Sequence, residues 1–215
     1  MKKLLSIILF FIMFLGGCSC KKGQSGTLVI PYKKFAEDTS TVTTPVNAMN
    51  LDKYLFRSDT QYVDLRDLED IMSDGYIAGF QFIPFHTIIA SFSNPETLYK
   101  MKDSKNENNE WIYAGQIGGF YQQYQESAQI ISSLFDKDKY IFFVSQAGSE
   151  GSYMINLLIQ LGYDGNKLYN VCGVIGTEGA YSYSVKGNQK YFVKGNRIVD
   201  SSIDYSFKSK LTPLQ

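Results

Sequence analysis

The stretch from residue 140 to residue 163, YIFFVSQAGSEGSYMINLLIQLGY, constrains the fold of this chain more than any other. It begins with a continuous apolar run of strand length, YIFFV, which is typical of a strand in the middle of a parallel sheet. A short glycine-containing loop follows, and then a helical pattern that stops at Gly162. Loops at the carboxyl ends of such strands are where many α/β proteins bind their ligands.

The flanking sequence repeats this alternation of strand and helix patterns. Strand, helix, strand, helix, strand implies a parallel sheet with helices on both faces, so the predicted class is α/β. A short helix with Asn50 as its N-cap is expected before the first strand, over residues 50–56. The expected strands cover 61–67, 80–85, 140–144 and 167–173, and the expected helices cover 68–75, 121–135 and 153–162.

Two regions lack this alternation. Residues 86–120 are irregular and polar, and the run SKNENNE at 104–110 predicts an exposed loop. The tail contains the tripeptide KGN twice, at 186–188 and 194–196. Each Gly-Asn supplies the positive-φ residues that a hairpin turn requires. Residues 181–215 are therefore expected to form a small C-terminal β-hairpin or meander.

The first residues have the pattern of a targeting signal. A positive MKK is followed by an apolar run of 12 residues, Leu4 to Leu15, which is too short to span a bilayer. The next residues, LGGC, resemble the bacterial lipobox, which implies cleavage after residue 17 and lipidation of Cys18. An ordinary secretory signal cut nearby is the alternative. We expect a signal peptide at 1–17 and a tether at 18–48, in which TLVIPY is a possible docking strand. The protein would be extracytoplasmic and anchored to the bacterial cell membrane by its lipid.

Charge and cysteine content exclude several partners. Lys plus Arg equals Asp plus Glu, 21 each, so no nucleic-acid partner is expected. A single histidine rules out a His-rich metal site, and no cofactor is implied. Cys20 and Cys172 could pair, but two isolated cysteines are no disulfide framework. The 16 Tyr and 15 Phe fit coding bias and β structure, with an aromatic sugar-binding platform as the alternative.

Three segments together resemble the rhodanese family over about residues 50 to 180. In residues 62–84 the family's Asp-x-Arg corresponds to Asp64 and Arg66, and its helical Glu to Glu69. Gly75 to Phe80 and Ile83-Pro84 complete that segment. The strand, loop and helix at 140–163 form the second segment. LYNVCGVIG forms the third, with Gly173 kept and Val174 in place of a second Gly. The resemblance implies a five-stranded parallel sheet in a domain at 49–180.

The resemblance also assigns roles to the loop after the central strand. The family's active loop reads Cys-x-x-Gly-x-Arg-Ser. In this register Ser145 occupies the Cys position, and Tyr76 replaces the usual His of the family. Gly148 is kept, Glu150 occupies the Arg position and Gly151 the Ser position. The whole degenerate loop comprises Ser145, Gln146, Ala147, Gly148, Ser149, Glu150 and Gly151.

These replacements work against sulfur transfer. A serine hydroxyl cannot carry a persulfide as a thiolate can. Glu150 also disfavours an anionic substrate, by about 1–4 kcal/mol at close range. The loop therefore indicates a binding or regulatory module for a neutral or cationic small ligand or a protein. A rhodanese-type sulfurtransferase or another unconventional enzyme remains the alternative, and a purely structural envelope protein is a third possibility.

Several residues admit a second interpretation. AGSEG fits a nucleophile elbow with Ser149 as nucleophile, but no histidine follows it in the chain. Cys172 is either a buried structural residue or a relocated nucleophile. His86 is either a general base or a packing residue. By analogy with the family, Asp64, Arg66, Tyr76 and Gly173 are expected to brace or line the pocket.

Overall fold

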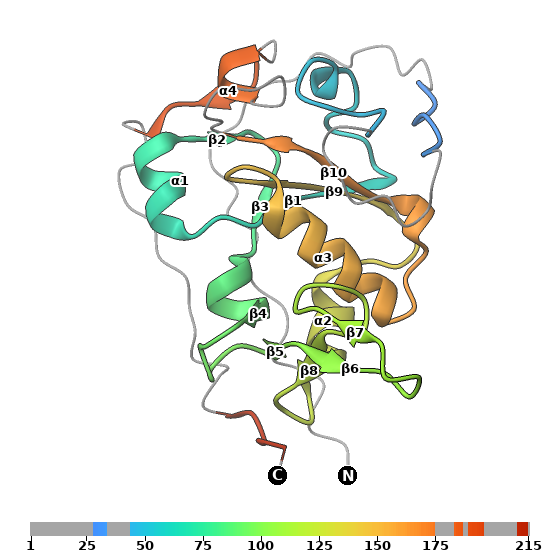
Figure 1. The fold of residues 1–215 in the computed structure, drawn as a ribbon. Helices are drawn as coiled ribbons and strands as arrows, with labels where there is room; N and C mark the ends of the chain where they lie inside the picture. Colours follow the sequence, from blue (N-terminus) through green and yellow to red (C-terminus); the bar gives the residue numbers. More distant parts are fainter. Residues whose placement is uncertain (1–27, 34–43, 175–182, 187–188, 196–209, 215) are drawn as a thin grey trace, which may run out of the picture.

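The structure, a computed structural model, describes residues 28–33, 44–174, 183–186, 189–195 and 210–214 (Figure 1). Its centre is a parallel sheet of four strands in the order β10-β9-β1-β3. The register runs without interruption from Thr60 opposite Tyr140 to Asp64 opposite Val144. The α/β class and the parallel sheet are confirmed, whereas the fifth strand is not found in this sheet among the described residues. The strands are β1 (Thr60–Asp64), β3 (Gln81–Phe82), β9 (Tyr140–Ser145) and β10 (Leu168–Gly173).

Alternate residues of β9 serve two hydrophobic clusters, one on each face of the sheet. Ile141 and Phe143 point into the first cluster, and Phe142 and Val144 into the second. This is the period-two alternation of a strand buried on both sides. The first face is covered by α2 (Ser127–Leu134) and α3 (Ser149–Gln160) (Figure 1).

The second face is covered mainly by chain without α-helix. A 3-10 turn, η1 (Leu51–Lys53), lies there with the short helix α4 (Tyr183–Lys186) and segments of the region expected to be a tether. Ile30, Val46 and Ala48 are almost completely buried in this cluster. Helices were expected on both faces of the sheet. Apart from α4, the second face is covered by apolar side chains on coil instead. The packed part of the chain thus begins before residue 49, although residues 28–33 form no strand.

The connections between strands follow the sequence pattern in part: the strand expected over 80–85 covers only Gln81–Phe82, and the helix expected over 121–135 covers only Ser127–Leu134. A helix, α1 (Leu68–Asp74), ends at Gly75, whose φ of +97° is one that residues with a side chain rarely adopt. The chain then forms β2 (Tyr76–Ile77) and β3, and Pro84 precedes one π-helical turn, η2 (Phe85–Ile89). The 3-10 turn η3 (Gly165–Lys167) leads into β10.

The region expected to be irregular contains two small sheets of its own. One consists of β4 (Ala90–Ser91), β5 (Tyr99–Met101) and β8 (Phe120–Gln122). The other is a hairpin of β6 (Ser104–Lys105) and β7 (Trp111–Ile112). Strands of two or three residues are too short to show a readable alternation, which explains why the sequence did not predict them. The turn at 107–110 is exposed, as predicted.

The tail differs from the expected meander in its described residues. The segment from Tyr183 to Lys186 is a helical turn, and β11 (Phe192–Val193) pairs antiparallel with β2 of the main body. Tyr183 is completely buried, and its hydroxyl donates to the carboxylate of Asp52 at 2.5 Å. This anchoring of a large side chain favours docking on the body over an independent hairpin.

The N-terminal predictions fall mostly outside the described residues. These are the signal peptide at 1–17, Cys18, Cys20 and most of the tether at 18–48. Within the residues that the structure describes, no helix is both long and apolar enough to cross a membrane.

Candidate functional site

The loop after β9 makes a tight turn onto the first residue of α3. Ser145 ends the strand and is completely buried. The backbone N–H of Gly148 donates to the Ser145 hydroxyl at 2.9 Å, and Val174 N–H donates to the Ser145 carbonyl at 2.8 Å. Gly148 has a φ of +101°, a conformation that a residue with a side chain adopts only at a cost. The serine side chain is therefore engaged by its own loop.

Asn170 on β10 holds the same loop from the neighbouring strand. Its side-chain amide donates to the carbonyl of Gly148 at 2.7 Å and to the hydroxyl of Ser152 at 3.1 Å. Gly151 lies so close that a Cβ there would sit 2.3 Å from the Asn170 Oδ1 atom. Sequence reasoning missed Asn170. The available signal was a single amide in the otherwise apolar strand LYNVC.

Gly173 and Gln146 mark how closely the ends of β9 and β10 approach. A Cβ at Gly173 would lie 2.7 Å from the carbonyl oxygen of Gln146. The Gln146 side chain extends toward α1, and its Nε2 lies 3.3 Å from the carboxylate of Asp74. Ala147, which follows Gln146 in the loop, is exposed. Gly173 therefore lies beside the loop, against the backbone of Gln146.

Glu150 turns its carboxylate back over the loop and meets His86. The His86 Nε2 and the Glu150 Oε1 are 3.7 Å apart, and the hydroxyl of Ser149 donates to Oε2 at 3.0 Å. The Glu150 side chain is 19% exposed and that of His86 is 41% exposed. His86 reaches this position because it is carried on the π-helical turn after Pro84. Sequence reasoning treated the two residues separately and missed their pairing.

The pair shifts both pKa values toward the charged forms. The imidazole of His86 is the main cause that lowers the pKa of Glu150 to about 2. The Glu150 backbone N–H and the hydroxyls of Ser145 and Ser149 lower the pKa further, while burial opposes the shift. Conversely, Glu150 raises the pKa of His86 against the effect of burial, and Asp67 adds to the rise. The loop thus carries a carboxylate that stays ionised beside an imidazole whose protonated form is favoured.

The order of contacts differs from that of a catalytic triad. In a triad the histidine lies between the nucleophile and the acid, because it must take the proton from the hydroxyl. Here Glu150 lies in the middle, receiving contacts from Ser149 on one side and His86 on the other. Ser145, the other hydroxyl at this loop, is completely buried. This geometry gives neither serine an activating base.

Asp64 and Arg66 form a buried ion pair at the end of β1. The guanidinium contacts the carboxylate through two nitrogens, with Nη2 to Oδ2 at 2.7 Å and Nε to Oδ1 at 3.0 Å. Nη2 also donates to the carbonyl of Gly75 at 2.7 Å, which ties the start of α1 to its end. The exposed fractions of the two side chains are 1% and 0%. These contacts hold the end of β1 and the end of α1 together.

Cys172 lies on the opposite face of the sheet from Ser145. It is paired in register with Val144, and side chains of adjacent residues on a strand point to opposite faces. The thiol is free and completely buried, and burial is the main cause that raises its pKa. A thiol that is neither ionised nor accessible is no nucleophile. The geometry therefore favours the structural interpretation of Cys172.

Tyr76 contacts the edge of the sheet. Its ring packs edge-to-face against Phe82 of β3, with the ring centroids 5.2 Å apart. In the strand order, β3 is separated from β9 by β1. Tyr76 and the loop residues were expected to share one rim, and this contact directs the tyrosine ring toward β3.

No known site or relative adds to this geometry. Among the described residues, no three His, Cys, Asp or Glu side chains gather closely enough to hold a metal ion. Comparison of the chain with protein-family models, with curated proteins and with solved structures finds no match.

Proposed function

We propose that this protein is a rhodanese-like lipoprotein that lies outside the cytoplasm and acts as a non-catalytic binding or regulatory module. The motif resemblance over residues 50 to 180 supports the family, and the LGGC motif supports the lipid anchor. The α/β sheet with a strand, loop and helix at 140–160 is compatible with the proposed family and with the proposed lipid anchor.

One observation carries the non-catalytic part of the proposal: the carboxylate of Glu150 lies over the loop that would hold an anionic substrate. It accepts a hydrogen bond from Ser149 and lies 3.7 Å from the Nε2 atom of His86. Its pKa of about 2 keeps it charged at every physiological pH. An incoming thiosulfate or phosphate would meet this fixed negative charge, which disfavours its binding.

The same charge distribution defines the partner that we propose. A neutral or cationic group, on a small molecule or on a protein, can approach Glu150 without repulsion and can replace His86 as its partner. The exposed Ala147 and Ser149 lie beside Glu150 in the loop. We therefore place recognition at this end of the sheet, with the loop as a rigid platform rather than as a reacting group.

A sulfurtransferase assay tests the proposal that the protein is not catalytic. Thiocyanate formation from thiosulfate and cyanide should be absent for the wild type, for Ser145→Cys and for Glu150→Arg. Ser145→Cys restores a thiol, but a thiolate beside Glu150 has a raised pKa and the donor is still repelled. The double variant restores the thiol and removes the carboxylate that lies over the buried position 145, so its activity should exceed the sum of the two single variants.

A matched control separates loop chemistry from general thiol reactivity. Ser132→Cys combined with Glu150→Arg carries the same two replacement types, but its cysteine lies on the exposed face of α2. It should remain inactive. Turnover by the wild type would overturn the non-catalytic proposal. Equal activity of Ser145→Cys and the double variant would contradict the role given to Glu150.

The lipid anchor has its own test. Cys18→Ala should leave an unprocessed precursor that takes up no labelled fatty acid and no longer partitions into detergent. Continued labelling of Cys18→Ala would contradict lipidation at this residue. The outcome is independent of the loop, because Cys18 lies outside the domain proposed at 49–180.

A further inference from the structure

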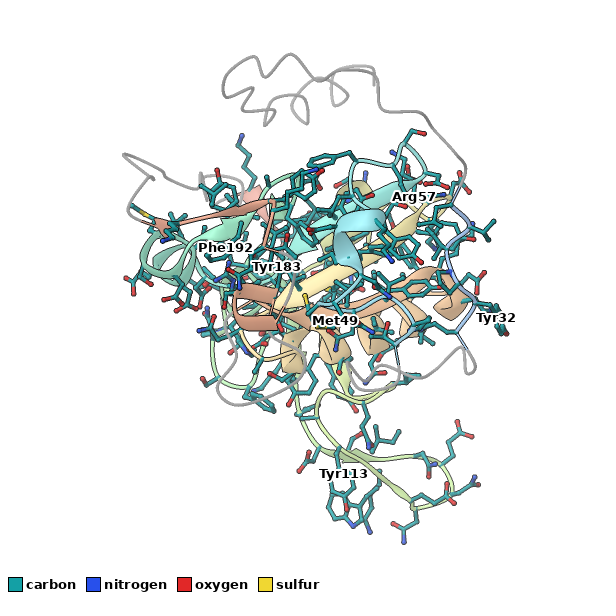
Figure 2. All side chains as sticks on the ribbon, turned by 90° about the horizontal axis from the view of Figure 1, so that it is seen from above. Tyr32, Met49, Arg57, Tyr113, Tyr183 and Phe192 are labelled. Atoms are coloured by element: carbon teal, nitrogen blue, oxygen red, sulfur yellow. The ribbon has the colours of Figure 1, made fainter. Side chains whose placement is uncertain are left out.

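The hairpin of β6 and β7 carries two exposed aromatic rings that lie nearly parallel. Trp111 is on β7 opposite Lys105, and Tyr113 follows two residues later, on the same side of the chain. The rings are 58% and 55% exposed, their planes differ by 15° and their centroids are 6.5 Å apart. Figure 2 shows this hairpin projecting from the body of the molecule with Tyr113 on it.

Hydrogen bonds within the hairpin hold its turn in place. The side-chain oxygen of Asn106 accepts from the backbone N–H of Asn108 and of Glu110, and its amide donates to the Glu110 carboxylate at 2.8 Å. The Lys105 ammonium donates to Asn109 and lies 5.0 Å above the ring of Trp111. The side chains around the rings are thus fixed by the turn.

The chain that follows the rings is fastened to α3. Asn156 donates to the carbonyl of Gly115 at 2.8 Å, and Gln160 accepts from the N–H of Gly118 at 2.8 Å. A rigid surface loses little conformational entropy when a ligand binds, so fixed rings favour binding over exposed rings on a mobile loop. Exposure of two aromatic rings in water also has a cost that packing elsewhere would avoid.

We propose that Trp111 and Tyr113 form a binding platform for a neutral carbohydrate chain. The face of an aromatic ring carries partial negative charge and is apolar, so it suits the C–H surface of a pyranose ring. Lys105 covers one face of Trp111, so the other face of Trp111 and the Tyr113 ring are the surfaces offered to one oligosaccharide. Exposed polar side chains of the same segment, Glu107, Asn108 and Gln116 among them, supply partners for hydroxyl groups.

The charge of the hairpin argues against a lipid surface as the partner. Insertion of aromatic residues into a bacterial membrane is assisted by cationic neighbours that attract anionic lipids. Residues 102–118 contain Lys102 and Lys105 against Asp103, Glu107 and Glu110, so two positive charges face three negative ones and the net charge is −1. A neutral sugar is indifferent to this balance.

Trp111 is the only tryptophan of the chain, so intrinsic fluorescence reports on the platform alone. The purified protein would be titrated with three trisaccharides: cellotriose, maltotriose and the β-linked trimer of N-acetylglucosamine. At least one should shift the emission of Trp111 to shorter wavelength with a saturable dependence. The apparent Kd should be insensitive to salt because the ligand is uncharged.

Variants assign the binding to the platform. By calorimetry, Trp111→Ala and Tyr113→Ala should each weaken binding about tenfold or more, since aromatic anchors dominate such small contacts. Phe92→Ala removes another exposed ring outside the hairpin and should leave the Kd unchanged. Circular dichroism would verify that each variant is folded.

Three results would overturn the proposal. The first is that none of the trisaccharides binds. The second is that Trp111→Ala and Tyr113→Ala bind as well as the wild type. The third is that Trp111 emission responds to vesicles of phosphatidylcholine, alone or mixed with phosphatidylserine, and not to the sugars.

Discussion

Two ion pairs lie at the same end of the central sheet, and they differ in almost every physical respect. Arg66 and Asp64 meet in two contacts, and neither side chain is more than 1% exposed. His86 and Glu150 approach only to 3.7 Å, and His86 is 41% exposed. The first pair connects backbone segments through Gly75, whereas the second spans the surface of the loop.

The difference separates the residues that hold the shape of this region from those that we propose to contact a partner. When a buried ion pair loses one member, the other is left as an uncompensated charge. Replacement of Asp64 or Arg66 alone is therefore expected to be strongly destabilising. A half-exposed pair at this distance contributes little to stability and can exchange partners with solutes. Asp64 and Arg66 therefore have the contacts of a structural pair, and the half-exposed His86 and Glu150 are the pair to which we propose a role in recognition.

The largest effect is expected from Arg66→Ala. Removal of the guanidinium leaves the Asp64 carboxylate buried without its partner, which should cost about 3–5 kcal/mol. For a chain of this size the melting temperature should fall by roughly 6–20 °C. Thermal unfolding followed by circular dichroism measures it.

Arg57→Ala is the matched control. Arg57 also pairs with a nearby aspartate, Asp59, at 2.6 Å, but with exposed fractions of 18% and 49%. Its loss should cost about 1 kcal/mol or less. Equal losses of stability in the two variants would remove the distinction between a structural corner and a surface pair.

The reactivity of the Cys172 thiol tests whether the region around the Asp64–Arg66 pair stays closed in the folded protein. Because the thiol is buried beside Asp64 and Arg66 and its pKa is raised, a thiol reagent should reach it only through opening of the fold. In a chain with Cys18→Ser and Cys20→Ser, native Cys172 should react at least about a hundredfold more slowly than in denaturant. Rapid reaction of the native protein would revive Cys172 as a nucleophile.

A smaller effect on stability is expected from Gly151→Ala, and its sign should be opposite to that usually seen when Gly is replaced by Ala in a helix. In a helix this change normally stabilises by about 1 kcal/mol. Here the new Cβ would meet Asn170, so we expect destabilisation of about 1–3 kcal/mol. A rise in the unfolding free energy by denaturant titration would show that Asn170 does not brace the loop as described.

The sequence was most informative where the local pattern is long. The apolar run at 140–144 and the helix that follows it are strong local signals, and both are confirmed. Gly75 ends α1 because only a residue tolerant of positive φ fits there, which the sequence also showed. Such elements are specified by their own residues.

The rest of the fold and of the candidate site depends on contacts between residues that are distant along the chain. Glu150 was assigned to the loop from its position, but its pairing with His86 spans 64 positions and has no local signal. The same holds for β11, which pairs with β2 rather than with its sequence neighbours. The cover of the second face by Ile30 and Val46 also required the tertiary structure. Short polar and apolar segments find such partners only in the folded chain.

The smallest effect on stability is expected from His86→Gln, and its pH dependence identifies the pair. The raised pKa of His86 means that its contribution is complete below about pH 6.5 and is lost as the pH rises through the higher folded value. The contribution of Glu150 is complete above about pH 4.5 and is lost as the pH falls toward about 2.

The difference between wild type and His86→Gln should therefore be largest between about pH 4.5 and pH 6.5, at about 0.5 kcal/mol, and should vanish once the pH exceeds the raised pKa of His86. Melting temperatures across this range measure it. A constant difference across the range would indicate packing of His86 instead of pairing.

Titration of His86 by proton NMR tests most directly whether Glu150 is held over the loop by this imidazole. His86 is the only histidine, so its ring signals need no assignment by mutation. We predict a pKa above the ordinary value of about 6.5 in the wild type and a fall toward that value in Glu150→Gln. Glu107→Gln, on the distant hairpin turn, should leave the pKa unchanged. If the pKa of His86 is the same in wild type and Glu150→Gln, the carboxylate does not occupy the loop and the account is contradicted.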